Sequence, residues 1–241
     1  MKDKIIEFSA PKKYLNFNKN FPKPIKLNIP EWYKKLKHTV EFKTIKGCIP
    51  FLETLTTGYS LELPQDFYLK TNHCDGGEEL YFEPSLVVNL DLNLNAKNLN
   101  ESHNPLQVKD SPVIKKNLNF PVLKILNPWT IRTPKGYSCL FVPPLNNGDD
   151  RFEIVPGIVN TDEFSKEINF PIIINGDKYP IQDTTLKQGT PYVQVIPFKR
   201  NNWKLKIIDR NLNKDQKSNF NFASKILNIY KEIFWNKISW K

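Results

Sequence analysis

Two acidic residues lie in the polar middle of the stretch Val155 to Ile174, "VPGIVNTDEFSKEINFPIII". Apolar runs typical of strands flank Asp162 and Glu163, so the acids are expected in a connection between two strands. Carboxylates there could form a catalytic loop that handles protons, or they could be a solvated hairpin tip. The pattern favours the tip and leaves both interpretations open. Asn160 is typical of a turn that its own side chain stabilises.

Other polar residues allow weaker hypotheses. The loop Asn146 to Asp150 has oxygen ligands that could hold a hard cation, but it lacks the spacing of a calcium loop and favours an acidic turn. Arg132, close to Trp129, is the first choice for an anion or carboxylate contact, with an edge salt bridge as the alternative. We expect Trp129 itself to be buried in the core. The three histidines, His38, His73 and His103, are far apart in the chain, and we expect no metal site.

The composition limits the classes of partner. The chain has 241 residues and a net charge of +10, but only four of its 35 basic residues are Arg. Because Arg suits bidentate phosphate and base contacts better than Lys, the charge argues against a nucleic-acid partner. The three cysteines are few and widely spaced, which indicates a reducing compartment. With no signal-peptide or membrane-spanning run, we expect a cytoplasmic location, in the host cytoplasm or a virion.

Proline placement divides the chain. The 19 prolines spare only the C-terminal tail, so short strands rather than long helices are expected before about residue 210. We expect an extended Pro-rich arm over 1–36, with one helical turn at "PEWYKKLK", and a β domain over 37–210. The Asn-Gly pair in "NGDKY" predicts a two-residue hairpin loop. Several short strands at close intervals predict an antiparallel sandwich or barrel.

The tail, 211–241, has a different pattern. From Ser218, apolar residues recur at near-helical spacing with lysines between them, which predicts a basic amphipathic helix of about five or six turns. Its apolar stripe is expected to pack on the β domain. The open alternatives are docking to a protein partner, self-association or binding to a membrane surface.

The order of segments resembles the dUTPase and dCTP-deaminase superfamily. "GYSCLFVPPLN", "PGIVNTDEFSKEINFPIII" and "LKQGTPYVQVIPF" are similar to that superfamily's successive strand, hairpin and strand motifs, and "TTGYSLELP" at 56–64 is similar to its first strand. A closer likeness is to an uncharacterised domain family of phage and bacterial genomes, through "PEWY", "CIPFLE", "PWTIRTPKGYS", "PPLN" and "GTPYVQVIPFKR". That family has no activity to transfer. The resemblance implies an all-β, β-clip-like domain over 37–210.

The resemblance also bears on chemistry. At the position of the superfamily's general base this chain has Asn160, an amide that cannot take a proton, and the phosphate turn reads Pro143-Pro144-Leu145-Asn146. We therefore favour a phage-encoded binding protein without catalysis, associated with a virion or its assembly, and expect no cofactor. The alternative is a nucleotide-processing enzyme that uses Asp162 or Glu163 after a register shift, with Mg²⁺ as its cofactor. Candidate ligand contacts are Arg132, Asn146, Asn160 and Gln194.

Overall fold

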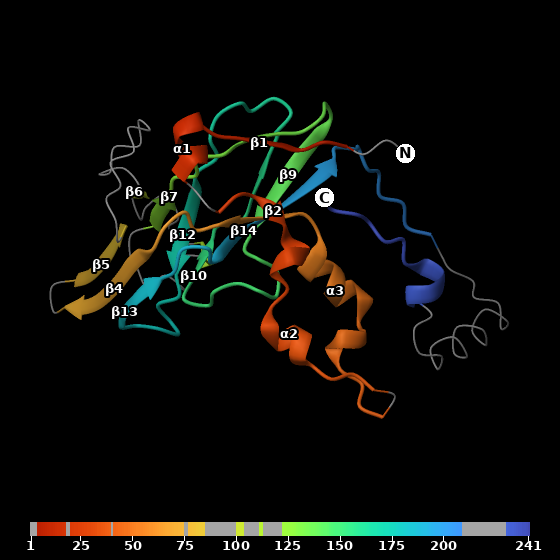
Figure 1. Ribbon diagram of the computed structural model, residues 1–241, viewed down its shortest axis with the longest axis horizontal. Helices are drawn as coiled ribbons and strands as arrows, with labels where there is room; N and C mark the ends of the chain where they lie inside the picture. The colour runs from red at the N-terminus through yellow and green to blue at the C-terminus, as the bar shows by residue number, and fades with distance from the viewer. Residues whose placement is uncertain are drawn as a thin grey trace.

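The computed structural model describes residues 4–17, 20–39, 41–74, 77–84, 100–103, 111–112, 122–208 and 230–241. In these ranges the protein is mainly β, and all of its strand pairs are antiparallel (Figure 1). The expectation of an antiparallel β protein is therefore confirmed. None of the helices in these ranges is long and apolar enough to cross a membrane.

A five-stranded sheet lies at the centre of the protein. Its order is β11 (Gly157–Val159), β9 (Tyr137–Val142), β14 (Pro191–Lys199), β3 (Tyr59–Glu62) and β2 (Lys23–Pro24). Val193 and Val195 of β14 are fully buried, as expected for a strand with neighbours on both sides. Pro197 lies beyond the last β14 residue that pairs with β3, where β14 has an open side that tolerates a residue without an N–H.

A four-stranded sheet packs against the first. Its order is β10 (Phe152–Ile154), β12 (Phe170–Ile174), β7 (Val122–Ile125) and β6 (Asn100–His103). Phe141 of β9 contacts Phe170 of β12 with ring centroids 5.4 Å apart, and Phe170 contacts Tyr192 of β14 at 5.8 Å. These rings join the two sheets into one hydrophobic core.

Two smaller sheets complete the body. One contains β13 (Gln182–Leu186), β4 (Phe67–Cys74) and β5 (Gly77–Pro84), and the other pairs β1 (Glu7–Ser9) with β8 (Thr130–Arg132). In β4, the buried Phe67, Leu69 and Thr71 alternate with more exposed residues, which is the period of a strand with one face on the core.

The N-terminal segment is part of the body, which corrects the expectation of an extended arm. Helix α1 (Lys12–Phe17) places Tyr14 in the core, where its ring meets the edge of Trp129 with centroids 5.7 Å apart. The burial of Trp129 confirms its expected role in packing. Since β1 also pairs with β8, residues 7–14 are held by both backbone and side-chain contacts.

A small helical lobe projects from one side of the sheets (Figure 1). It contains η1 (Ile25–Asn28), α2 (Glu31–Lys35), η2 (Ile45–Gly47) and α3 (Ile49–Thr56). The helical turn expected at "PEWYKKLK" is confirmed as α2, with Pro30 at its N-cap. Tyr33 of α2 stacks on Phe51 of α3 at 5.9 Å, and this contact holds the two helices together.

Two local expectations are corrected. The Asn175-Gly176 pair does not form a hairpin, because β12 pairs with β10 and β7 whereas β13 pairs with β4. In the tail, Tyr230–Phe234 form a single π-helical turn and 235–241 have no helical structure. The prediction of an amphipathic helix is therefore wrong for residues 235–241. Its part at 209–229 lies outside the described residues.

Candidate functional site

The stretch that contains Asp162 is a crossing between sheets and not a hairpin. β11 pairs with β9 in the five-stranded sheet, whereas β12 lies between β10 and β7 in the other sheet. The connection 160–169 therefore passes from one sheet to the other. It brings Asn160 and Asp162 beside the start of β9 and the end of β14, which no local pattern in the sequence indicates.

The carboxylate of Asp162 is fully engaged inside the protein. Arg200 donates from Nη1 to Oδ1 at 2.7 Å and from Nη2 to Oδ2 at 2.5 Å, and the Gly136 amide donates to Oδ2 at 2.8 Å. The side chain of Asp162 is only 2% exposed. The hydrogen bonds from Arg200 lower the pKa of Asp162 to about 2, so the group is an anion with little tendency to take up a proton.

Arg200 also connects Asn160 to the same group of side chains. Its Nη1 donates to Ser138 Oγ at 3.0 Å and to the Tyr137 carbonyl at 3.1 Å, and Ser138 Oγ donates to Asn160 Oδ1 at 2.8 Å. We call Arg200, Asp162, Asn160 and Ser138 the Arg200 cluster. Sequence reasoning missed Arg200, although it directly follows the long apolar strand β14 and is one of four arginines in the chain.

A second set of hydrogen bonds continues from the Arg200 cluster into the core. Thr133 and Thr161 share a hydrogen bond between their hydroxyls at 2.7 Å, and Thr161 Oγ1 donates to Cys139 Sγ at 3.4 Å. Burial raises the pKa of the Cys139 thiol to about 11, so it is protonated near neutral pH and is a poor nucleophile. This end of the sandwich is a polar network whose groups bond to one another.

The other acidic candidate is in a different environment. Glu163 follows Asp162 directly, but its residue is exposed. The amide of Glu163 donates to the Asn160 carbonyl at 3.1 Å, which is part of a turn. The two neighbouring acids therefore have different surroundings, one inside an ion pair and the other at the surface.

Gln194 and Asn146 come together at a separate place, where β14 meets α3. Gln194 is fully buried, and its Nε2 donates to the carbonyls of Thr54 at 3.0 Å and Thr57 at 2.7 Å. Its Oε1 accepts from the Leu145 amide at 2.9 Å. Asn146 has a φ of 57° and donates from Nδ2 to Thr54 Oγ1 at 2.8 Å. Gln194 thus joins the end of α3 to the 143–147 turn.

Arg132 does not join either group. It is exposed on β8, opposite Glu7 of β1 in the register of the two-stranded sheet. The four candidate ligand contacts are therefore divided among three places: Asn160 in the Arg200 cluster, Gln194 and Asn146 beside α3, and Arg132 at a sheet edge. The structure does not gather them around one cavity.

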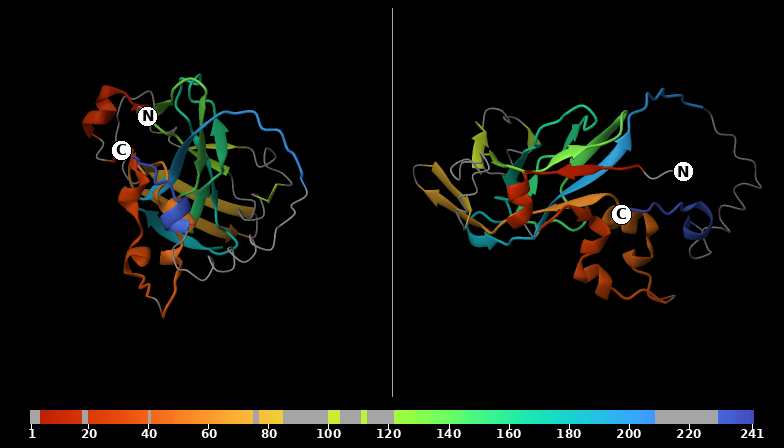
Figure 2. Two further views of the ribbon diagram at one scale, coloured as in Figure 1. Left: turned by 90° about the vertical axis from the view of Figure 1, so that its right-hand side faces the viewer. Right: turned by 45° about the horizontal axis from the view of Figure 1, so that its top comes forward.

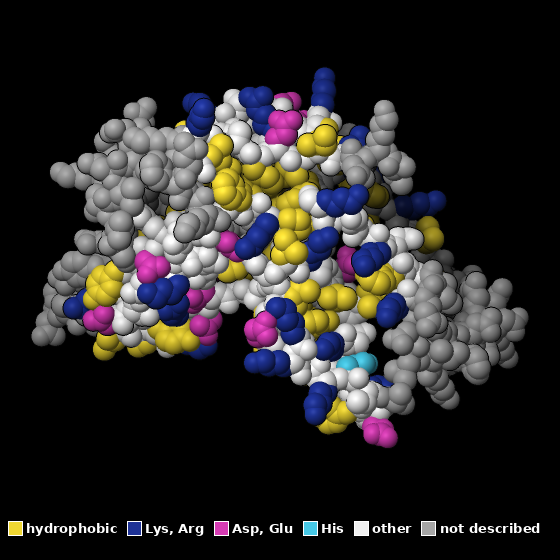
Figure 3. Space-filling view, in the orientation of Figure 1, with side chains coloured by type: hydrophobic (Ala, Val, Ile, Leu, Met, Phe, Trp, Pro, Cys, Tyr) yellow, Lys and Arg dark blue, Asp and Glu magenta, His cyan; other side chains and the backbone are white. Residues whose placement is uncertain are grey.

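The acidic loop expected at 146–150 is bonded to basic neighbours. Asp149 accepts from Arg151 Nε at 2.9 Å and from Arg151 Nη2 at 2.6 Å, and Asp150 pairs with Lys178 and accepts from Tyr179 Oη at 2.9 Å. Across the part of the chain that the structure describes, no three His, Cys, Asp or Glu residues are grouped to hold a metal ion. On the face seen in Figure 3, Lys and Arg are spread out and form no single basic patch.

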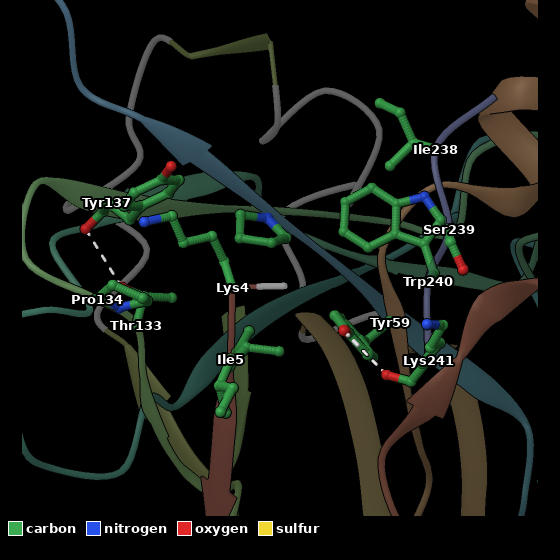
Figure 4. A pocket seen from close by; sticks show the side chains of 12 residues that line it. Lys4, Ile5, Tyr59, Thr133, Pro134, Tyr137, Ile238, Ser239, Trp240 and Lys241 are labelled. Carbon is green, nitrogen blue, oxygen red and sulfur yellow. Dashed lines mark hydrogen bonds between the residues drawn. The ribbon is translucent and has the colours of Figure 1, made fainter. Parts of the chain in front are cut away.

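A groove of about 250 Å³ lies next to the Arg200 cluster, and residues from both ends of the chain line it. Lys4 and Ile5 lie on one side, Thr133 comes from the segment that joins β8 to β9, Tyr137 from the start of β9 and Tyr59 from β3 (Figure 4). The remaining side is formed by residues 238–241. Lys4 Nζ lies 6.0 Å from the centre of the Tyr137 ring.

The tail is bound at this groove through specific contacts. The ring of Trp240 meets the edge of Tyr59 with centroids 5.8 Å apart, and Tyr59 Oη donates to the Lys241 carbonyl at 3.2 Å (Figure 4). Partial burial raises the pKa of Tyr59 above its ordinary value, so its hydroxyl keeps its proton and donates at neutral pH. The surface around Tyr59 therefore binds a peptide segment through an aromatic side chain and a backbone oxygen.

Comparison of the chain with protein-family models and with curated proteins gives no match. The function must therefore be argued from the geometry. That geometry consists of an ion-paired acid, two partly buried polar networks that bond internally, and a groove with the tail as one wall.

Proposed function

We propose that this chain is a phage-encoded binding protein without catalytic activity, built on a β-clip-like body and associated with a virion or its assembly. The observation that carries this proposal is the state of Asp162. The carboxylate nearest to the superfamily's general-base position is held by Arg200 and the Gly136 amide, with a pKa of about 2. A general base for work at neutral pH needs a much higher pKa.

The arrangement of strands supports the β-clip part of the proposal. The segments that resemble the dUTPase and dCTP-deaminase superfamily fall on β3, β9, β11, β12 and β14. Four of these strands are consecutive neighbours, in the order β11-β9-β14-β3, of one sheet, whereas β12 lies in the other main sheet. Tyr59 of β3 and Val195 of β14, which are 136 residues apart in the chain, are thus paired in space, as one shared scaffold would require.

The binding role is supported by the groove beside the Arg200 cluster. Its lining combines the apolar Ile5 and Pro197 with the hydroxyl of Tyr59 and the ammonium group of Lys4. The lining therefore offers both apolar contact and polar groups, and placed polar groups fix the orientation of ligands in binding sites. Residues 238–241 form one wall of the groove, where Trp240 and Lys241 contact Tyr59, so this part of the body already binds a peptide segment at its edge.

The test separates binding from catalysis. The protein is incubated with a panel of nucleoside triphosphates and Mg²⁺ or Mn²⁺, alongside the Asp162→Asn and Glu163→Gln variants. We expect no turnover above the rate without protein in any of the three. Turnover that either substitution abolishes would establish the nucleotide-processing alternative and overturn the proposal.

The assignment to a virion or its assembly has its own test. Phage particles are purified from lysates of the host of the encoding phage, and assembly intermediates are separated from free protein by density. Mass spectrometry of these fractions is expected to detect the chain in particles or intermediates. Detection only in the free-protein fraction would contradict the association.

A further inference from the structure

After β14 the chain leaves the body with its apolar side chains uncovered. Residues 201–208 have no strand or helix, and all of them are exposed. Trp203 is 90% exposed, Leu205 83%, Ile207 88% and Ile208 70%. Large apolar residues scattered singly on a surface need no explanation, but four within six residues are typical of an interaction segment.

The chain then returns to the body at its other end. In Figure 2, the segment that follows β14 runs away from the sheets, and the C-terminal residues lie back against the body near the N-terminal strand. Trp235 Nε1 donates to Glu53 Oε1 on α3 at 2.7 Å, and Trp240 contacts Tyr59. Residues 235–241 are therefore bound to the body, whereas 201–208 contact little of it.

Residues 235–241 and residues 201–208 differ in whether a single copy of the chain can provide their contacts. Every contact of 235–241 with Glu53, Tyr59 and the groove is available from the tail of the same copy or from the tail of another copy. The apolar residues at 201–208 are covered in neither case by their own body. In an exchanged pair, however, the two segments cross from one body to the other side by side and can cover each other, as in domain swapping.

We propose that residues 235–241 bind the groove of a second copy of this chain, and that the 201–208 segments of the two copies pack together between the bodies. The occupant follows from the contacts of the tail, because residues 235–241 of this chain already bind Glu53 and Tyr59 and form one wall of the groove. The covalent connection would otherwise favour binding within one copy, because it gives the tail a high effective concentration at its own body. Burial of Trp203, Leu205 and Ile207 is the contribution that favours exchange.

This inference rests on the proposed binding function, since it names a second copy as a partner of the groove. Other occupants of 201–208, such as a different protein or an anionic lipid surface, are outcomes that the experiment separates. The lysines at 204 and 206 would lie on the opposite side of an extended segment from Trp203 and Leu205. Packing through the apolar side therefore leaves the charges in water.

The experiment is crosslinking between two differently tagged copies that are expressed together. One carries Lys4→Cys and the other Ser239→Cys, both in a background of Cys48→Ser and Cys74→Ser, and a short bismaleimide is added. We expect a covalent dimer that carries both tags. A matched control replaces Lys4→Cys with Ile181→Cys, an exposed position just before β13 at the other end of the body (Figure 1), and should give no mixed dimer.

Light scattering on the full chain gives an independent readout. The wild type is expected at twice the monomer mass, and the variant Trp203→Ser/Leu205→Ser/Ile207→Ser at the monomer mass with an unchanged circular dichroism spectrum, because these side chains are exposed in a single copy. The exchange would be overturned by a monomeric wild type together with a variant that carries both Lys4→Cys and Ser239→Cys and crosslinks only within itself. A monomer that binds vesicles containing anionic phosphatidylserine through Trp203 would overturn it as well. Nucleotide turnover tests the proposed function separately, whatever the mass.

Discussion

Arg200 and Asp162 form a two-point ion pair that joins the first residue after β14 to the crossing between the two main sheets, with donor–acceptor distances of 2.7 and 2.5 Å. The planar guanidinium matches both carboxylate oxygens at once, which Lys could not do. Because the Asp162 side chain is almost fully covered, this pair closes one end of the sandwich.

Acid should weaken the protein through Asp162. Its folded pKa of about 2 lies below the value near 3.9 expected in an unfolded chain, so the unfolded state binds the proton first as pH falls. The stabilisation is complete above about pH 4 and is lost between about pH 4 and 2. Thermal unfolding from pH 7 to 2 should show a midpoint that falls more steeply below pH 4 in the wild type than in Asp162→Asn.

The matched comparison for the ion pair is Arg200→Lys, which keeps the positive charge but loses the planar guanidinium that bonds to both carboxylate oxygens. We expect its unfolding midpoint at pH 7 to be lowered by several degrees. In the double variant Arg200→Lys/Asp162→Asn, the two effects should not add, because both substitutions remove the same contact. Additive losses would show that the two residues act independently.

Gln194 should be essential for the junction between β14 and α3. In Gln194→Leu the carbonyls of Thr54 and Thr57 and the amide of Leu145 lose their partner while the site stays buried. Unsatisfied buried groups make this costly, and we expect a loss of about 2–4 kcal/mol in the free energy of unfolding, measured by urea denaturation. The control is Gln188→Leu on the surface, where a loss within about 1 kcal/mol is expected. Equal losses in both would contradict this role.

Alanine substitutions at three glycines should distinguish the cost of backbone strain from the cost of a steric clash. Gly58 has a φ of +81°, and an added Cβ would lie 2.2 Å from the Val195 carbonyl oxygen, whereas Gly136 has a φ of +84° and open space around it. Gly136→Ala should lose about 1–2 kcal/mol of unfolding free energy from its left-handed backbone alone, and Gly58→Ala should lose more. Gly157→Ala, with neither feature, should stay within about 0.5 kcal/mol. The same denaturation measurement ranks all three.

Tyr14 tests whether the N-terminal segment belongs to the folded body. Its ring is buried against Trp129, so Tyr14→Ala should lose about 3 kcal/mol of unfolding free energy. Leu15→Ala, at the neighbouring and more exposed position, should lose within about 1 kcal/mol. If both variants unfolded like the wild type, the segment would be a separable arm after all.

The sequence was informative where the local pattern and the tertiary role agree. The dense prolines excluded long helices, and runs such as "YSCLFV", "FPIII" and "YVQVIPF" became β9, β12 and β14. Burial of Trp129 and the turn at α2 were also predictable, since an aromatic ring seeks the core and proline favours a helix start. In contrast, Asn175-Gly176 failed as a hairpin signal because each flanking strand found its partner elsewhere.

By itself, the sequence determined that this chain forms short antiparallel strands around an aromatic core, because residue periodicity and proline geometry act locally. Only the tertiary structure decided that β11 and β12 belong to different sheets, that Arg200 meets Asp162, and that the tail contacts Tyr59. Each of these is a contact between residues far apart in the chain or a choice of strand partner. Such contacts depend on which surfaces are left to bury once the strands have formed, and no local pattern specifies them.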